Sequence, residues 1–396
     1  MCIFCCTFAS KMNKDLLYKE LEDWYEVNHR ILPWRETDDP YKIWISEIIL
    51  QQTRVAQGME YYHRLITRFP DIQSLAQAEE DEVLLYWQGL GYYSRARNLH
   101  KAAQLMKNHE LFKLNNNINN LRGNQLSAAL NGHSSELLNS EQIFAALRSM
   151  PGVGDYTAGA IASFAFDLPY PALDGNVYRV LSRLYDCEIA FDTTQGKKHF
   201  RKLAEELLDR EHPRLFNSAI MELGALHCVP TAPDCHTCPL NTWCKALANN
   251  TVELLPVRKP RPKVRDRYLE YTIYITPERT TLIHQRKGND IWKHLWEFVE
   301  TTSVDFKNDN IDNLRGNQLP AALQRNTSEL LNPYKVIEIT HVLSHQKLHA
   351  RFVIKNVSEL PEIPDTLVVS LNDLDNYAFS RLTLNAIEKL LITDHS

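Results

Sequence analysis

Four cysteines that lie close together constrain this chain more than any other feature of its sequence. Cys228, Cys235, Cys238 and Cys244 follow the spacing C-x6-C-x2-C-x5-C. Zinc ribbons usually pair two short knuckles across a longer loop, whereas one short run of four thiolates is typical of a cluster wrapped by a single loop. Disulfides are disfavoured because the sequence shows no export signal. The spacing therefore predicts a four-cysteine iron–sulfur cluster whose role is structural, since no position stays open for a substrate.

Length and composition limit the classes of protein that fit. The chain has 396 residues, which is enough for two or three domains, and 44% of them are hydrophobic. No apolar stretch approaches the roughly 20 residues of a membrane helix, so no membrane partner is expected. Because the net charge is −5, any nucleic-acid surface must be local. Residues 1–13 are expected to be an N-terminal extension without the basic region of a secretory signal, which favours a cytoplasmic location.

Two kinds of apolar periodicity divide the chain. Residues 14–250 are expected to form helices because apolar residues recur at intervals of three and four. Residues 268–396 show more alternation, as in 271–275 and 350–354, which predicts strands. Residues 251–267 between them contain three prolines and are positively charged, so they are expected to be a linker, either solvated or lying against phosphates.

Two segments share one sequence although their surroundings differ. The run Asn-Leu-Arg-Gly-Asn-Gln-Leu occurs at 120–126 and again at 313–319, and the likeness continues to Ser-Glu-Leu-Leu-Asn in both copies. Repeat architectures need adjacent units that stack, which two distant copies cannot provide. The segments of about 115–139 and 309–332 are therefore expected to be inserted surface segments.

A glycine-rich turn indicates a contact with phosphate. Pro151-Gly-Val-Gly154 lies between two helical stretches and is followed by the small apolar run 157–162. Glycines at Gly152 and Gly154 allow main-chain N–H groups to approach an anion, and the helix that follows favours one at its start. A tight helical connection is the alternative, but the small residues after the turn favour a DNA-binding helix-hairpin-helix.

Two carboxylates have the settings that N-glycosidic cleavage requires. Glu47 lies in an otherwise apolar helical run, where a desolvated carboxyl group can hold its proton and act as a general acid. Asp174 begins a helix, where aspartate commonly acts as an N-cap and where N–H groups would lower its pKa. One protonated and one ionised carboxyl group form the pair used by glycosidases. The alternatives are a solvated glutamate and a purely structural cap.

These features in this order resemble the helix-hairpin-helix DNA glycosylases with an iron–sulfur loop, and most closely the MutY-type adenine DNA glycosylases. The resemblance covers most of residues 14–250 and rests on Leu32–Arg35, Asp39–Val55, Gly89–His100, the hairpin, Leu173–Val177 and the four cysteines. It implies an all-α glycosylase core with a 4Fe-4S loop and, after it, a Nudix-like α/β domain. It also implies double-stranded DNA as the partner of a monomeric enzyme associated with the nucleoid of a bacterial-type cell.

The resemblance assigns roles to the catalytic residues. It implies that Glu47 protonates adenine, and that Asp174 stabilises the oxocarbenium-like sugar or attacks it, with Tyr156 and Asn176 as supports. Bifunctional relatives such as endonuclease III have a lysine at the position of Tyr156, where it forms a Schiff base. A tyrosine cannot do so, which favours base removal without strand cleavage.

The resemblance also implies two groups of DNA-contacting residues. The adenine is extruded from the stack into a pocket formed by Trp34, Arg35, Leu50 and Glu222. The opposite base is contacted by Gln52, Thr53, Leu90 and Tyr92, of which Tyr92 would wedge into the stack.

Residues 268–396 resemble the domain that such glycosylases use to recognise 8-oxoguanine. Ile291–Phe298 fits its aromatic strand, and Ser344 and His345 could hydrogen-bond the lesion. Leu343 replaces the family's phenylalanine, which puts a stacking role there in doubt. The sequence contains no run of glutamates like a Nudix hydrolase box, so nucleotide hydrolysis is not expected.

The sequence thus predicts a monofunctional glycosylase that removes adenine mispaired with 8-oxoguanine or guanine in base excision repair. Two other functions stay open: a bifunctional glycosylase and lyase of the endonuclease III type, and a non-catalytic iron–sulfur protein that binds DNA. Tyr156 and the second domain argue against the first, and the presence of both Glu47 and Asp174 argues against the second.

Overall fold

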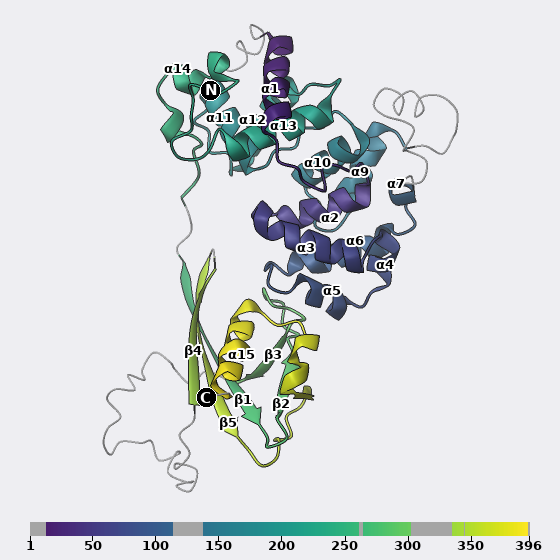
Figure 1. Cartoon of the computed structure of the whole chain (residues 1–396), viewed down its shortest axis with the longest axis vertical. Coiled ribbons are helices and arrows are strands. Elements are labelled where there is room, and N and C mark those ends of the chain that lie inside the picture. Colours follow the sequence, from purple (N-terminus) through teal and green to yellow (C-terminus); the bar gives the residue numbers. More distant parts are fainter. Residues whose placement is uncertain (1–12, 114–137, 261–263, 302–334, 344, 395–396) are drawn as a thin grey trace. The chain divides into compact units, whose positions relative to one another are not determined.

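The computed structural model groups the chain into two compact units. It describes residues 13–113, 138–260, 264–301, 335–343 and 345–394. The helical unit contains the described residues of 1–77 and 98–260, and the sheet unit contains those of 78–97 and 261–396 (Figure 1). Apart from residues 138 and 139, both predicted inserts lie outside the described residues.

The helical unit consists of helices joined by short loops, as the apolar periodicity predicts. Its α-helices are α1 (Lys14–Asn28), α2 (Pro40–Leu50), α3 (Val55–Arg68), α4 (Ile72–Gln77), most of α6 (Ser94–Met106), α7 (Glu110–Lys113), α9 (Ser140–Ser149), α10 (Asp155–Phe166), α11 (Gly175–Tyr185), α12 (Thr194–Leu207), α13 (Pro213–Leu226) and α14 (Lys245–Ala248). Two 3-10 turns follow at η3 (Asn241–Trp243) and η4 (Val252–Leu254). No described helix of the chain is long and apolar enough to cross a membrane.

Helices α2 and α10 form the centre of this unit and carry two of the predicted site residues. The Asp39 side chain caps α2 by accepting from the Tyr41 N–H at 2.9 Å, and Pro40 occupies the first turn, where its missing N–H costs nothing. Every residue of α2 from Pro40 to Ile49 except Lys42 is buried, as is every residue of α10 from Thr157 to Phe166. The two helices pack against each other, so Glu47 and Tyr156 are held inside the unit rather than on its surface.

The end of the first repeated segment is part of the fold. The Asn139 side chain accepts from the Gln142 N–H at 2.9 Å, and the Gln142 side chain accepts from the Asn139 N–H at 2.8 Å. This is a capping box, which satisfies two backbone donors that helix formation leaves unpaired. The helix α9 therefore begins on a residue that the sequence assigns to the insert.

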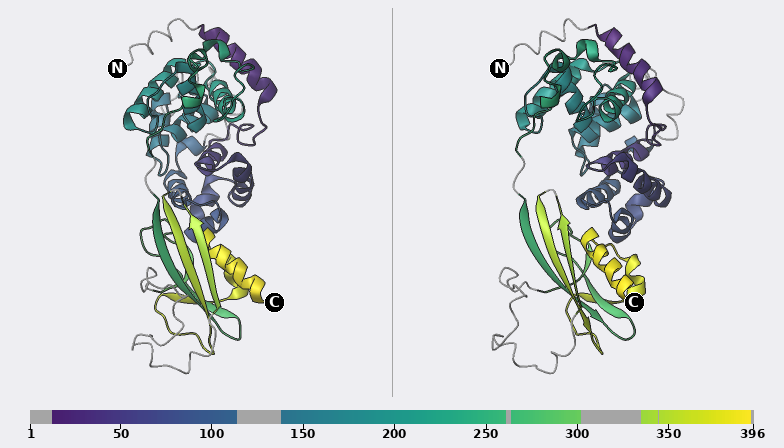
Figure 2. Two further views of the ribbon diagram at one scale, coloured as in Figure 1. Left: turned by 90° about the vertical axis from the view of Figure 1, so that its left-hand side faces the viewer. Right: turned by 60° about the vertical axis from the view of Figure 1, so that its left-hand side comes forward.

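The sheet unit is a six-stranded mixed sheet with one long helix beside it (Figure 2). The strand order is β4-β5-β1-β3-β2-β6, with bounds β1 (Arg265–Ile275), β2 (Thr280–Gln285), β3 (Trp296–Glu300), β4 (Lys335–Val342), β5 (Gln346–Asn356) and β6 (Thr366–Ser370). β1 and β5 are parallel, with Tyr271 opposite Phe352, and the other pairs are antiparallel. η6 (Leu371–Asn376) leads to α15 (Arg381–Asp394), whose Leu382, Ala386 and Leu390 are buried.

The sheet unit also contains a segment from the first quarter of the chain. Residues 78–97 include α5 (Glu80–Trp87) and cluster with the sheet although residues on both sides belong to the helical unit. Phe379 holds this segment through its backbone, because its N–H donates to Gln88 Oε1 at 2.7 Å and its carbonyl accepts from the Tyr93 hydroxyl at 3.0 Å. His294 contacts Glu80 as well.

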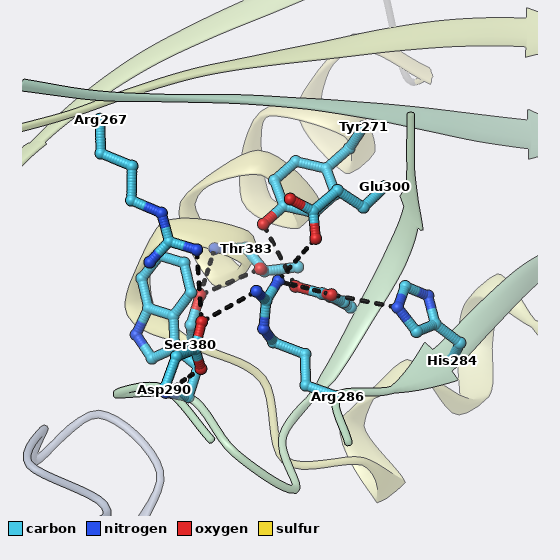
Figure 3. A network of polar contacts seen from close by, with 10 residues as sticks. Arg267, Tyr271, His284, Arg286, Asp290, Glu300, Ser380 and Thr383 are labelled. Carbon is cyan, nitrogen blue, oxygen red and sulfur yellow. Dashed lines mark hydrogen bonds and ion pairs between the residues drawn. The ribbon is translucent and has the colours of Figure 1, made fainter. Parts of the chain in front are cut away.

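A network of ion pairs lies inside the sheet unit (Figure 3). Glu297, on β3, is only 3% exposed, and its carboxylate accepts from Arg286 at 2.7 Å and from the Tyr271 hydroxyl at 3.2 Å. Arg286 also contacts Glu300 at 2.9 Å and Asp290 at 2.8 Å. A buried carboxylate is costly without such partners. The network therefore neutralises these carboxylates by arginine and ties β3 to the turn that precedes it.

Candidate active site

One large cavity in the helical unit collects most of the predicted site residues. Its volume is about 770 Å³, which is within the range of small-molecule sites. Among the residues that line it are the predicted Trp34, Arg35, Glu47, Leu50, Gln52, Thr53, Gly152, Gly154, Tyr156, Asp174, Asn176 and Glu222. The residues come from segments far apart in the sequence, and the packing of the helices brings them together.

Glu47 is buried at one side of this cavity and has two polar partners. Its side chain is 1% exposed. The Tyr156 hydroxyl donates to Glu47 Oε2 at 2.6 Å, and Arg35 Nη2 donates to Oε1 at 3.1 Å. Burial and the neighbouring carboxylates hold the pKa of Tyr156 well above 10, so this hydroxyl keeps its proton and donates it. The apolar run predicts the burial of Glu47, but it does not reveal either partner.

Asp174 is the N-cap of α11, as its position in the sequence predicts. Its Oδ1 accepts from the Val177 N–H at 2.7 Å, and its Oδ2 accepts from the Asn176 side chain at 2.8 Å. The expectation of a lowered pKa is wrong. Burial raises the pKa of Asp174 more than these hydrogen bonds lower it, and the charge of Glu47 raises it further. Desolvation, which the sequence pattern does not show, is the larger effect here.

The predicted adenine pocket contains a residue that the sequence analysis missed. Arg30 binds Glu222 through its backbone N–H at 3.0 Å, its Nε at 2.5 Å and its Nη2 at 2.8 Å. Trp34 is buried edge-to-face against Tyr62. Arg30 lies four residues before Trp34, in the same short run as Arg35. This second arginine is the feature of the sequence that could have indicated a further residue of the pocket.

Arg35 is held in a fixed position at the same cavity. Its guanidinium lies 3.6 Å from the centre of the Phe164 ring and pairs with Glu47. Within the described part of the chain, its buried Nη1 has no hydrogen-bond partner. A buried donor of this kind is expected to meet an acceptor on a bound molecule.

The hairpin glycines adopt the geometry that the turn requires. Gly152 has φ of +80°, and a Cβ there would stand 2.9 Å from the Asn98 Cβ, so both conformation and space favour glycine. Gly154 precedes α10 as its N-cap without a side-chain cap. On the other side of the cavity, Gln52 has φ of 60° and is exposed. Main-chain N–H groups at the hairpin are thus available to an anion.

The four predicted cluster cysteines line one small cavity together with Arg183. Burial raises the pKa of Cys238 to about 12, and the charges of the other cysteines add to the increase. Arg183 Nη1 lies 3.3 Å from Cys228 Sγ. Helix α11 thus has Asp174 as its N-cap and contacts the cysteine loop from its last turn.

A second arginine of α11 connects the loop with the carboxylate. Arg179 Nε donates to the Cys228 carbonyl at 2.7 Å, and its Nη2 donates to Asn176 Oδ1 at 2.9 Å. Since Asn176 in turn donates to Asp174, an unbroken series of hydrogen bonds joins Cys228 to the predicted catalytic aspartate.

Comparison with known proteins identifies the family to which this chain belongs. Residues 45–210 match the HhH-GPD superfamily of base excision DNA repair proteins, and residues 271–389 match the NUDIX domain. An adenine DNA glycosylase of Buchnera aphidicola subsp. Baizongia pistaciae is 30% identical over 90% of this chain and 92% of its own length. The chain belongs to the adenine DNA glycosylase family. It is a DNA N-glycosylase of base excision repair with a helix-hairpin-helix core and a Nudix-like domain.

Two further similarities cover a smaller share of the chain. The adenine DNA glycosylase of Mus musculus is 36% identical over 62% of this chain and 44% of its own length. Among solved structures, a thermostable thymine-DNA glycosylase is 23% identical, with a TM-score of 0.48 over 61% of this chain and 99% of that chain.

The remaining predicted contacts of this glycosylase belong to the sheet unit. Leu90 is buried, whereas Tyr92 is 49% exposed and has φ of 49° in a tight loop. His345 is exposed in the turn between β4 and β5, where the Leu343 N–H donates to the Gln346 carbonyl at 2.7 Å. Ser344 lies outside the described residues. These roles stay predictions.

Proposed function

We propose that this glycosylase is monofunctional and removes adenine mispaired with 8-oxoguanine or guanine. The contact between the Tyr156 hydroxyl and Glu47 carries the proposal, because it puts a phenol where a lyase would need an amine. The phenol orients the carboxyl group of the general acid and cannot form a Schiff base.

Base removal divides between the two carboxyl groups. In its protonated form, Glu47 delivers its proton to the departing adenine, and its contacts with Tyr156 and Arg35 fix the carboxyl group toward the base. Asp174, in its ionised form, stabilises the positive charge that develops on the sugar, or attacks the sugar, while Asn176 keeps its orientation.

The adenine is bound by the residues around Glu47. Arg35 Nη1, which lacks a partner among the described residues, donates to a ring nitrogen of the base. Glu222, held by Arg30, accepts from the exocyclic amine, and Trp34 and Leu50 provide apolar contact.

In the helical unit, Gln52 and Thr53 contact the opposite base, while Gly152 and Gly154 hold a backbone phosphate. In the sheet unit, Leu90 and Tyr92 are the proposed contacts with that base, and Tyr92 wedges into the stack. Ser344 and His345 distinguish 8-oxoguanine from guanine by hydrogen bonds at N7 and O8.

A 4Fe-4S cluster held by Cys228, Cys235, Cys238 and Cys244 is part of the proposal. The four thiols line one small cavity. Their short spacings support a cluster wrapped by a single loop over a zinc ribbon, which usually pairs two knuckles across a longer loop. The iron charge would offset the mutual repulsion of the thiolates, and Arg183 would face one of them.

The experiment is single-turnover release of adenine from three duplexes, with adenine opposite 8-oxoguanine, guanine or thymine. We expect release of adenine from the first two duplexes and little from the third. The proposal also takes the enzyme to act as a monomer on double-stranded DNA in the cytoplasm. Equal release from all three would contradict the mispair specificity. Strand cleavage at the rate of base release would contradict monofunctional chemistry.

A further inference from the structure

A second cavity lies beside the catalytic one and has no part in the reaction above. Its volume is about 310 Å³. It shares with the catalytic cavity the lining residues Gly154, Tyr156, Leu173, Tyr178 and Lys197. The two cavities are therefore adjacent.

Three cations line this second cavity. They are Arg148 at the end of α9, and Lys197 and Arg201 on α12. Asp155, the first residue of α10, pairs with both arginines, and its contact with Arg201 measures 3.0 Å. Arg201 also pairs with Glu205 at 2.9 Å. Three positive and two negative charges leave one positive charge in excess, and Lys197 forms no ion pair with any described residue.

The ion pairs at this cavity are open to solvent. Asp155 is 56% exposed, and Arg148 and Arg201 are 44% and 37% exposed. Exposed pairs of this kind contribute little to stability, so an arriving anion can share or replace the carboxylate at low cost. The wall behind them is aromatic, since Phe144 stacks on Tyr170 with ring centres 4.1 Å apart. Because the two rings already pack against each other, this wall is rigid. The cations at its rim suit a phosphate.

We propose that this second cavity binds a backbone phosphate of the strand that carries the target adenine, and that Asp155 occupies the arginines until the phosphate arrives. Arg148 and Arg201 bind the phosphate, and Lys197 lies between it and the catalytic cavity. Asp155 weakens binding to any DNA by one opposing charge, and it holds the two arginines in position before the strand is bound. The inference rests on the duplex binding proposed above.

The test is the salt dependence of affinity for a duplex with a non-cleavable adenosine analogue opposite 8-oxoguanine. The double variant Arg148→Gln/Arg201→Gln removes the proposed contact, and Asp155→Asn removes the opposing charge. Lys202→Gln is the matched control, because Lys202 lies on the same helix, is exposed and does not line the cavity.

Each lost phosphate contact lowers the slope of log K against log salt by about 0.9, so over a fourfold rise in salt the double variant should lose about 3.5-fold less affinity than wild type. Asp155→Asn should bind several-fold more tightly than wild type, a gain that misfolding cannot produce. Lys202→Gln should keep the wild-type slope.

Two results would overturn the inference. One is an unchanged slope in the double variant, and the other is an equal change in Lys202→Gln, which would show only general charge attraction. Failure of the wild-type protein to bind the duplex at all would instead refute the proposed function.

Discussion

Gly224 on α13 allows α11 to approach closely, and a single methyl group there should disturb catalysis. A Cβ at this position would stand 2.7 Å from the Asn176 Cβ and 3.0 Å from the Asn176 carbonyl oxygen. Carbon atoms in contact lie about 3.5–4.0 Å apart, so in Gly224→Ala the start of α11 must move by about 1 Å. Asn176 would move with it, and the Asn176 side chain is hydrogen-bonded to both Asp174 and Arg179.

The expected loss is larger in rate than in stability. A misplacement of about 1 Å near reacting groups can cost about 100-fold in rate. Overpacking costs about 1–3 kcal/mol of unfolding free energy, and the better helix propensity of alanine returns about 1 kcal/mol. Gly224→Ala should therefore melt only slightly earlier than wild type but release adenine about 100-fold more slowly.

The assay is single-turnover release of adenine, measured together with thermal melting. Gly288→Ala is the control, because a Cβ there meets nothing within 4 Å. A folded Gly224→Ala protein with the wild-type rate would refute the reasoning, since Asp174 would then not depend on this close approach.

Three further predictions concern the chemistry of the site. Glu47→Gln should abolish adenine release but keep duplex binding, because Glu47 is buried away from phosphates; a near-normal single-turnover rate would rule it out as the acid. Tyr156→Lys should allow borohydride to trap a covalent protein–DNA adduct. Because Lys197 also lines the cavity, the double variant Tyr156→Lys/Lys197→Gln is the control and should form the adduct equally well. Less adduct in the double variant would show that Lys197, and not the new lysine, reacts. The raised pKa of Asp174 should make the rate fall with decreasing pH at a higher pH than an ordinary aspartate would, because catalysis needs its ionised form. The same shift stabilises the fold at low pH, and this contribution disappears as the pH rises through the raised pKa. A pH–rate profile and urea unfolding at matched pH measure the two effects, and an acid limb at the usual aspartate pKa would contradict the shift.

Local patterns of the sequence predicted the elements that depend on neighbouring residues. Asp174 was predicted to cap a helix and caps α11, because capping is decided within three residues. The apolar run around Glu47 predicts its burial for the same reason. The family resemblance, which the comparisons confirm, added the order of the domains.

Other features depend on residues that meet only in the folded chain. Arg30 reaches Glu222 across 192 positions, and Gly224 meets Asn176 across a helix crossing, so no local pattern reveals either contact. The predicted direction of the pKa shift of Asp174 was wrong, because the desolvation of its carboxyl group comes from surrounding helices. The roles of Leu90, Tyr92 and His345 stay predictions.

The attachment of residues 78–97 to the sheet means that the C-terminal part is not a detachable module. Tyr93 is buried, and its hydroxyl bonds to the carbonyl of Phe379, almost 300 positions later in the chain. A gene truncated after codon 260 would still encode all the residues of the catalytic cavity. Its product, however, would expose the face of residues 78–97, including Tyr93, that the sheet normally buries. A premature stop codon in the second half of the gene would thus also disturb residues 78–97 in the first half of the protein. A fragment designed to isolate the glycosylase core would need substitutions in this segment to stay in solution.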